Sequence, residues 1–257
     1  MAYVPRHDEI VKILSRLRNV SVQELTERTG VSEVTIRKDL TALEEMGLVV
    51  RTHGGAQLVE DITVLRDLEA RSSDHVPEKQ LIAARAARLV SNGDTIFLDS
   101  GSTCALLARE IAGLSLRVVT NSVPVINALS DARGITLFCI GGTYRIEAGS
   151  FVGPIALENL RNFQIETCFV GATGISGRGV FSCQSILEAQ LKNQVLESSG
   201  RRVVLADTSK FSTKAFSIFG RTGDVDIILA EHDFAEAENL RRLGIEVLLA
   251  DQPEATR

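Results

Sequence analysis

The sequence predicts an α/β protein in two parts, a small helical domain with a hairpin and a larger domain with a mostly parallel sheet. The chain has 257 residues, which is comfortable for two domains, and its 44% of hydrophobic residues can fill sizeable cores. Helical periodicity and one hairpin pattern occupy residues 1 to 60. From residue 95 onward, short apolar runs alternate with helical segments, which is typical of a parallel sheet covered on both faces.

Two short helices are predicted at the start of the chain. Apolar residues recur at helical spacing between His7 and Arg18, which predicts the first helix. Ser21 and Glu24 have the spacing of a capping box, so a second helix begins there and ends at Gly30.

The third predicted helix runs from Ser32, a good N-cap, to Gly47, which tolerates the positive φ of a helix end. Its inward side consists of Leu40, Leu43, Met46 and either Val34 or Ile36. Its opposite side carries Thr35, Arg37, Lys38 and Thr41. Such side chains donate to bases and phosphates, so this side suits the major groove. Capped helix, glycine turn and helix together predict a helix-turn-helix whose last helix reads DNA.

A hairpin after this helix completes a winged helix-turn-helix. Leu48 to Arg51 and Ala56 to Val59 are predicted strands, and Thr52 to Gly55 is a tight turn between them. Arg51 and His53 on this wing are expected to reach phosphates or a minor groove, where arginine is favoured by the negative potential.

The charge balance excludes a protein that holds nucleic acid by bulk charge. The formal net charge is −5, and residues 1 to 60 carry eight basic against nine acidic side chains. DNA binding therefore depends on a local patch, and one head is expected to bind modestly and to need a second copy.

The head resembles the DeoR family of bacterial sugar-operon regulators. The resemblance rests on Arg6, on Ser32-x-x-Thr35-Ile36-Arg37-Lys38-Asp39-Leu40, and on a wing spelled Arg51-Thr52-His53-Gly54-Gly55-Ala56. The chemistry and the resemblance together give these candidate DNA contacts: Arg6, Ser32, Thr35, Arg37, Lys38, Thr41, Arg51, His53 and Gly54.

The second part of the chain is predicted to alternate strands and helices after a linker that contains a short helix. A helix is predicted from Glu78 to Leu89. The predicted strands are Thr95 to Leu98, Arg117 to Thr120, Ile135 to Ile140, Thr167 to Val170, Val203 to Ala206, Ile227 to Ala230 and Glu246 to Leu249. Helices are predicted to begin near Thr103, Val123, Pro154, Ile186 and Ala235.

Small polar clusters follow four of these strands. They are Asp99 to Thr103, Thr120 to Ser122, Gly141 to Thr143 with Arg145 close behind, and Asp207 to Lys210. The glycine and hydroxyls at Gly101-Ser102-Thr103 directly begin a helix, whose free amides favour an anion. Parallel sheets bind ligands at the carboxyl ends of their strands. The clusters therefore predict a pocket for a small, polyhydroxylated and phosphorylated ligand.

The same family resemblance extends through this domain, at Asp99-x-Gly101-Ser102-Thr103, Gly171-Ala172, Glu188-Ala189-x-x-Lys192 and Asp207-x-Ser209-Lys210-Phe211. It implies a fold similar to ribose-5-phosphate isomerase and the CoA-transferases, and a phosphate held by the Gly-Ser-Thr loop. It also implies that Lys192 and Lys210 are cationic or structural contacts, and that Asp99 or Asp207 meets hydroxyls. The candidate effector-binding residues are Asp99, Gly101, Ser102, Thr103, Thr120, Asn121, Ser122, Gly141, Gly142, Arg145, Lys192, Asp207 and Lys210. Thr173 departs from the family, which often has aspartate there.

Two alternatives remain beside a regulator. One is a sugar-phosphate isomerase with an accessory DNA-binding head; the acids and the glycine-rich lysine loop that such isomerases carry are missing after Val170 and Phe181. The other is an activator or architectural DNA-binding protein whose second domain serves only oligomerisation.

Four cysteines, Cys104, Cys139, Cys168 and Cys183, lack the spacing of a zinc site and are expected to be free thiols in a reducing cytosol, three of them buried. No metal, no cofactor and no membrane segment is predicted, and a cytoplasmic location is expected.

The sequence as a whole predicts a repressor with a DNA-binding domain at 1–57, a linker at 58–77, an effector domain at 78–251 and a tail at 252–257. The predicted partners are double-stranded operator DNA, a phosphorylated sugar, and a second copy of the chain in a homodimer or homotetramer.

Overall fold

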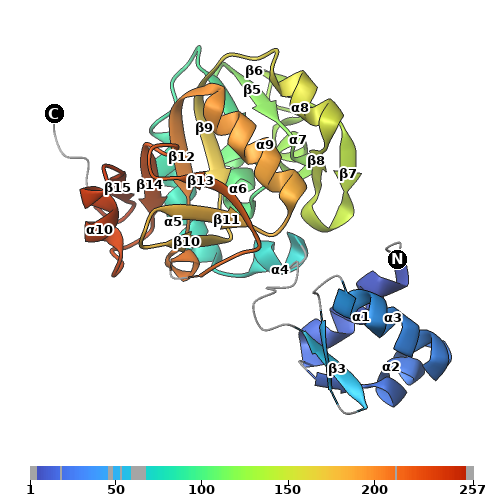
Figure 1. Ribbon diagram of the computed structural model, residues 1–257. Coiled ribbons are helices and arrows are strands. Elements are labelled where there is room, and N and C mark those ends of the chain that lie inside the picture. Colours follow the sequence, from blue (N-terminus) through green and yellow to red (C-terminus); the bar gives the residue numbers. More distant parts are fainter. Residues whose placement is uncertain are drawn as a thin grey trace. The chain divides into compact units, whose positions relative to one another are not determined.

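The computed structural model describes residues 5–17, 19–45, 49–52, 54–58, 68–211 and 213–252. The chain divides into two compact units, Met1–Val64 and Leu65–Arg257. Within the described residues, the smaller unit combines helices with a three-stranded sheet, and the larger unit is built on a seven-stranded sheet (Figure 1).

The smaller unit has the predicted helices and hairpin. Its elements are α1 (Pro5–Leu17), β1 (Asn19–Ser21), α2 (Val22–Thr29), α3 (Glu33–Glu45), β2 (Val49–Thr52) and β3 (Gly55–Leu58). β2 and β3 pair antiparallel, and β1, a strand that the sequence does not predict, pairs with the other edge of β3. The predicted residues Met46, Gly47, Leu48, His53 and Val59 lie outside the described part of the chain.

Local capping sets the bounds of α2. The Ser21 hydroxyl accepts from the Glu24 amide at 3.1 Å. At the other end Gly30 has φ 70°, a left-handed conformation that glycine adopts without steric penalty, and its amide donates to the Thr26 carbonyl at 2.9 Å. The predicted beginning and end of this helix are confirmed.

The core of the smaller unit lies between the three helices and the hairpin. Its fully buried members include Ile10, Leu14, Leu25, Ile36, Leu40 and Leu43. Of the two alternatives for the inward side of α3, Ile36 is the one that faces the core, since it stands four residues before Leu40. Val34, the other alternative, is 65% exposed.

The larger unit is organised around a parallel sheet in the order β15-β14-β12-β9-β4-β5-β6. Its strands are β4 (Thr95–Leu98), β5 (Leu116–Thr120), β6 (Ile135–Cys139), β9 (Ile165–Gly171), β12 (Ser199–Leu205), β14 (Ile227–Ala230) and β15 (Glu246–Leu249). Every pairing in it is parallel. All seven predicted strands are present, and three of them have the predicted bounds. The order along the chain reverses between β4 and β9, which is the position where open parallel sheets bind ligands.

Helices cover both faces of this sheet. They are α4 (Leu68–Ser73), α5 (Val76–Ala87), α6 (Ser102–Glu110), α7 (Val123–Leu129), α8 (Pro154–Leu160), α9 (Ile186–Glu197) and α10 (Ala237–Arg242). α5 begins two residues before the predicted Glu78, because Pro77 is accommodated in its first turn. α10 begins at Ala237, two residues after the predicted Ala235.

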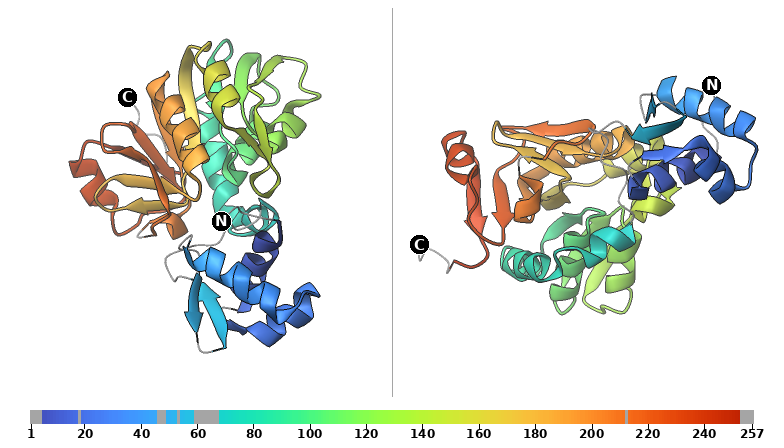
Figure 2. Two further views of the ribbon diagram at one scale, coloured as in Figure 1. Left: turned by 45° about the vertical axis from the view of Figure 1, so that its right-hand side comes forward. Right: turned by 90° about the horizontal axis from the view of Figure 1, so that it is seen from below.

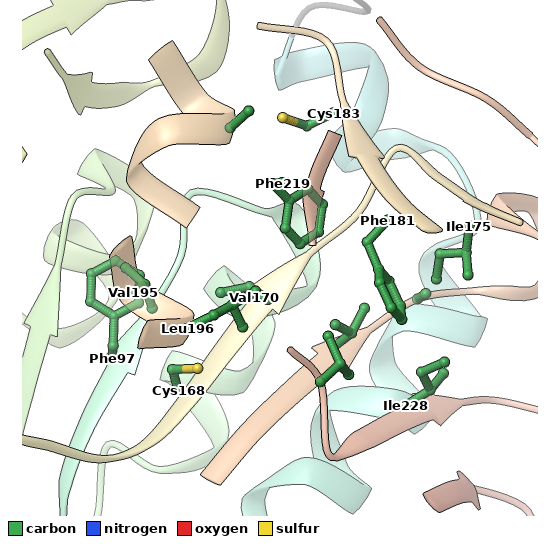
Figure 3. Packing of buried hydrophobic residues seen from close by; sticks show 14 of the residues in the cluster. Phe97, Cys168, Val170, Ile175, Phe181, Cys183, Val195, Leu196, Phe219 and Ile228 are labelled. Carbon is green, nitrogen blue, oxygen red and sulfur yellow. The ribbon is translucent and has the colours of Figure 1, made fainter. Parts of the chain in front are cut away.

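Alternate strand residues enter two separate cores, one on each face. Ile96 and Leu98 pack with α5, α6 and α7, while Phe97 between them packs with α8 and α9. The sheet between these two groups of helices can be followed in the ribbon views (Figure 2). Figure 3 shows the second core, where Val170 of β9 and Phe219 lie beside the side chains of α9.

Shorter elements that the sequence does not predict are added at the edges. They are β7 (Thr143–Arg145), η1 (Ile146–Ala148), β8 (Ser150–Val152), β10 (Gly174–Ser176), β11 (Val180–Cys183), η2 (Thr208–Lys210) and β13 (Ser217–Arg221). β7 and β8 form a hairpin, and β10, β11 and β13 form a small antiparallel sheet.

The cysteines of the described chain are free thiols; Cys104, Cys168 and Cys183 are buried and Cys139 is exposed. Burial raises the pKa of Cys168 to about 11 and that of Cys183 to about 11, so both stay protonated. Among the described residues no cluster of three His, Cys, Asp or Glu side chains could hold a metal ion, and no helix is long and apolar enough to cross a membrane.

Candidate functional site

Ser32 and Thr35 place two hydroxyls at the N-terminus of α3. Their Oγ and Oγ1 atoms are 3.0 Å apart, and the Thr35 amide is 3.4 Å from Ser32 Oγ. The amides of Thr35 and Ile36 also donate to the Ser32 carbonyl. Ser32 therefore caps α3 as predicted.

Arg37, Lys38 and Thr41 lie along the solvent side of α3. Arg37 Nη2 is 3.1 Å from Glu33 Oε2 in an exposed i,i+4 pair, an interaction that contributes only about 0.3–0.5 kcal/mol. A DNA phosphate can replace so weak a partner. Thr41 Oγ1 donates to the Arg37 carbonyl at 2.9 Å, and Lys38 is exposed.

The wing is tied to α3 through Arg51. Its amide donates to Glu44 Oε1 and its Nη1 to Thr41 Oγ1, each at 3.3 Å. Two predicted DNA contacts, Arg51 and Thr41, are thus brought together. Gly54 is exposed with φ 91°, and its carbonyl accepts from the Val22 amide at 2.8 Å. A Cβ at the neighbouring Gly55 would meet the Val20 carbonyl oxygen at 2.2 Å, so only glycine fits where β1 and β3 meet.

Arg6 lies against α3 and holds it to α1. Its Nε and Nη2 donate to the two carboxylate oxygens of Asp39 at 2.6 and 3.0 Å, and His7 Nε2 is 3.4 Å from Asp39 Oδ1. Burial acts to raise the pKa of Asp39, but hydrogen bonds and charge from Arg6 and His7 outweigh it and hold that pKa below its ordinary value. Sequence reasoning assigned Arg6 to DNA and did not foresee this bidentate pair, whose partners are 33 positions apart.

Asp99 and Lys192 form a buried ion pair at the point where the strand order reverses. Asp99 follows β4, and its Oδ2 accepts both from Lys192 Nζ and, at 3.0 Å, from the amide of Gly171, the last residue of β9. Lys192 Nζ also donates to the Gly171 carbonyl at 2.9 Å. Burial acts to lower the pKa of Lys192, but the nearby Asp99 carboxylate, together with Cys183 and Glu188, outweighs it and raises that pKa above its ordinary value. Lys192 consequently stays charged, and its contacts with Asp99 and Gly171 fix the loop geometry.

The Gly101-Ser102-Thr103 loop begins α6 directly beside this pair. Gly101 is the N-cap residue, and the Ala105 amide donates to its carbonyl at 3.1 Å. A Cβ at Gly101 would lie 3.8 Å from the Gly171 Cα, so the two strand-end loops run close together. Ser102 is half-buried and Thr103 is buried.

The loop after β5 is fully buried. Thr120 Oγ1 donates to the Leu98 carbonyl at 2.6 Å and accepts from the Ser122 amide, while Ser122 Oγ caps α7 by accepting from Val125. Asn121 Nδ2 donates to the Phe151 carbonyl at 3.2 Å, and its Oδ1 is buried with no hydrogen-bond partner in the described structure.

The remaining candidates lie at other strand ends. Gly141 and Gly142 have φ 63° and 116°, and a Cβ at Gly142 would meet the Val152 carbonyl oxygen at 2.7 Å. Arg145 Nη1 is 3.3 Å from Glu188 Oε1 of α9. Asp207 caps η2 by accepting from the Ser209 amide at 3.2 Å, and its Oδ2 is 3.7 Å from Lys210 Nζ.

Three polar residues near these strand ends were not among the site residues that the sequence predicted. They are Glu188, which pairs with Arg145, Glu231, whose carboxylate accepts from Thr208, and Lys79, which is buried and donates to the Arg71 and Asp74 carbonyls. The signal available for Glu188 was its position four residues before Lys192, which places both side chains on one face of the predicted helix.

Two domain models of the DeoR family match the chain. Residues 6–62 match the DeoR-like helix-turn-helix domain, and residues 74–232 match the DeoR C terminal sensor domain.

Full-length relatives carry regulator names. The transcriptional repressor AccR of Agrobacterium fabrum is 32% identical over 228 residues, 88% of each chain. The lactose phosphotransferase system repressor of Streptococcus mutans is 34% identical over 243 residues, 93% of this chain and 95% of that one. A putative aga operon transcriptional repressor of Escherichia coli O157:H7 is 32% identical over 252 residues, 96% and 94% of the two chains.

Solved structures are more distant. Ribose 5 phosphate isomerase A from Neisseria gonorrhoeae has a TM-score of 0.40 at 16% identity over 53% of each chain. eIF2B delta from Chaetomium thermophilum has a TM-score of 0.48 at 16% identity over 79% of this chain and 65% of that chain.

The regulator matches extend through both units and most of the chain, so the isomerase alternative is not favoured and the protein is a regulator rather than an enzyme. The head that presents α3 and the wing is the unit that matches the helix-turn-helix domain. This chain belongs to the DeoR family of DNA-binding transcriptional regulators.

Proposed function

We propose that this protein represses a carbohydrate-catabolism operon and is released from its operator by a phosphorylated sugar. The relatives named as lactose phosphotransferase system and aga operon repressors support the carbohydrate assignment. Residues 1–57 bind DNA, 58–77 link the units, and 78–251 bind the effector.

The observation that carries the effector assignment is the arrangement of strand ends at the reversal between β4 and β9. The N-terminus of α6 offers free amides and the Ser102 and Thr103 hydroxyls to a phosphate. On the adjacent strand end, the unpaired Asn121 Oδ1 is an acceptor for a sugar hydroxyl. A buried acceptor without a partner destabilises by about 1–3 kcal/mol, which favours a ligand that donates to it.

Asp99 and Lys192 position the loops of the site rather than contact the phosphate, because the charge of each is already paired with the other. Lys210 is only partly buried and supplies a cation whose ammonium can turn toward an anion. The roles of the Asp99–Lys192 pair and of Lys210 are both inferred from contacts within the sensor unit.

Release requires that the effector bind unequally to two arrangements of paired heads, since a ligand with equal affinity for both shifts nothing. A homodimer or homotetramer on a repeated or palindromic operator supplies such arrangements. Sedimentation of the free protein and of its operator complex measures the number of copies.

The first test is a thermal-shift screen of the full-length protein with sugar phosphates beside their unphosphorylated parents. A ligand at 100 times its Kd adds about 2.7 kcal/mol of stability. For a chain of this size that corresponds to a rise in Tm of about 5–10 °C. A rise with one phosphate and not with its parent sugar supports the proposal. Equal rises for both, or release of operator by neither, contradict it.

A further inference from the structure

The helix α3, which we propose reads DNA and call the recognition helix, carries one large apolar side chain that lies outside the core of the head. The other large apolar residues of α3, namely Ile36, Leu40 and Leu43, have no exposed surface and belong to the core cluster. Val34 is 65% exposed and is absent from that cluster. Its role is therefore not to stabilise the head.

Val34 lies among the groups assigned to DNA. Arg37, Lys38 and Thr41 stand three, four and seven residues after it, which puts the four side chains on one face of the helix. Its neighbours on the first turn are the exposed Glu33, which pairs with Arg37, and the Ser32–Thr35 hydroxyl pair. A valine thus sits within a polar surface, in the N-terminal part of the helix whose residues contact base edges in helix-turn-helix complexes.

The chemistry of the major groove restricts what such a side chain can recognise. Valine neither donates nor accepts hydrogen bonds, so it gains nothing from the donor and acceptor positions of the bases. The one apolar group that a base pair presents in the major groove is the C5-methyl of thymine. Valine also has one strongly preferred χ1 rotamer in a helix, so its two methyl groups point in a fixed direction.

We propose that Val34 is a specificity residue that packs against the C5-methyl of a thymine in each operator half-site. The proposal rests on the DNA-binding function of the head and adds the base that its first helical turn selects. Arg37 and Lys38 then supply affinity through phosphates and polar base edges, while Val34 discriminates thymine from bases that lack the methyl group.

The test begins with a library of DNA duplexes that are random over about 20 base pairs, from which the full-length protein selects its preferred sequence. In that duplex each thymine is replaced in turn by uracil, which removes only the C5-methyl. Burial of one methyl-sized group is worth about 0.8 kcal/mol. We therefore expect one uracil position in each half-site to weaken wild-type binding by about fourfold.

The decisive comparison is a double-mutant cycle with Val34→Ala. The variant should bind the thymine duplex about as weakly as the wild type binds the uracil duplex, and should not distinguish the two duplexes. Val34→Ala is expected to fold normally because the side chain is exposed and lies outside the core. Ile155→Ala is the matched control, since Ile155 is 62% exposed on α8 of the other unit and should keep full discrimination.

The inference is overturned if no single uracil weakens wild-type binding. It is also overturned if the change from thymine to uracil weakens binding by Val34→Ala as much as it weakens binding by the wild type. Failure to select any sequence at all would instead refute sequence-specific DNA binding by the head, which separates the two claims.

Discussion

At the scale of single residues, the Asp99–Lys192 pair shows that a motif residue can have a structural partner elsewhere in the chain. Both side chains are buried, and each is the other's counter-charge. Lys192 Nζ also lies 5.4 Å from the centre of the Phe219 ring, in a buried and partly apolar environment. An unpaired charge in this place is strongly unfavourable.

We accordingly predict that Lys192→Met lowers the free energy of unfolding by about 3–5 kcal/mol, because the Asp99 carboxylate is left buried without a counter-charge. Asp99→Asn in the same chain should restore most of this stability. Urea unfolding measures both. Lys214→Met, a change at an exposed lysine of the same unit, should stay within about 0.5 kcal/mol of the wild type. A destabilisation by Lys192→Met no larger than that of this control would contradict the buried-pair argument.

At the scale of elements, the Arg6–Asp39 pair joins α1 to α3, the helix that is predicted to read DNA. Asp39 is buried on the inner side of α3, opposite the exposed residues that we propose contact DNA. Arg6→Ala and Asp39→Asn are therefore both expected to weaken operator binding by similar factors, since either change releases α1 from α3. Fluorescence anisotropy with labelled operator checks this. If Arg6 acts by contacting a phosphate, only Arg6→Ala will be harmful.

The same pair predicts the acid response of the head. The folded pKa of Asp39 lies below its ordinary 3.8, so the unfolded chain binds more protons in that range and stability rises with pH. The stabilisation by Asp39 is present above pH 3.8 and is lost as the pH falls through the folded pKa. The stability difference between wild type and Asp39→Asn should therefore shrink on acidification below about pH 4, as measured by urea unfolding at several pH values. A difference that stays constant with pH would argue against the ion pair.

Lys79 of α5 contacts the backbone of α4 and of the turn that follows it. Lys79 Nζ donates to the carbonyls of Arg71 and Asp74, and burial lowers the pKa of this lysine, against which Asp207 acts to raise it. In Lys79→Met those carbonyls have no donor from this side chain, and hydrogen exchange of the α4 amides should accelerate while that of the α6 amides stays unchanged. Equal exchange in wild type and variant would mean that α4 is held by other contacts.

At the scale of the whole molecule, the head and the sensor are expected to carry separable functions. Arg37→Ala with Lys38→Ala should weaken operator binding and lower the slope of log affinity against log salt by about 0.9 for each phosphate that is no longer neutralised. Effector-induced thermal shifts should be unchanged. Ser102→Ala with Thr103→Ala should do the reverse, giving a repressor that still binds DNA but is not released. If both pairs of substitutions have the same effect, the division between the units is wrong.

Prediction from the sequence succeeded where the information is local. The periodicity of apolar residues gave the helices of the head and the seven strands of the sheet, and Ser21 and Gly30 gave the bounds of α2. Short strands such as β1, β7 and β10 were missed, because their stability comes from partners elsewhere in the chain rather than from their own pattern.

The sequence by itself therefore determined the two-part fold, the family and the polar strand ends, since each depends on residues within one turn, strand or motif. Only the tertiary structure decided what those side chains do. It paired Arg6 with Asp39 across 33 positions and Asp99 with Lys192 across 93, buried Ile36, and left Val34 exposed. The physical reason is that charge pairing and burial depend on distances in space, and these are set by the packing of helices and strands that are remote in the chain.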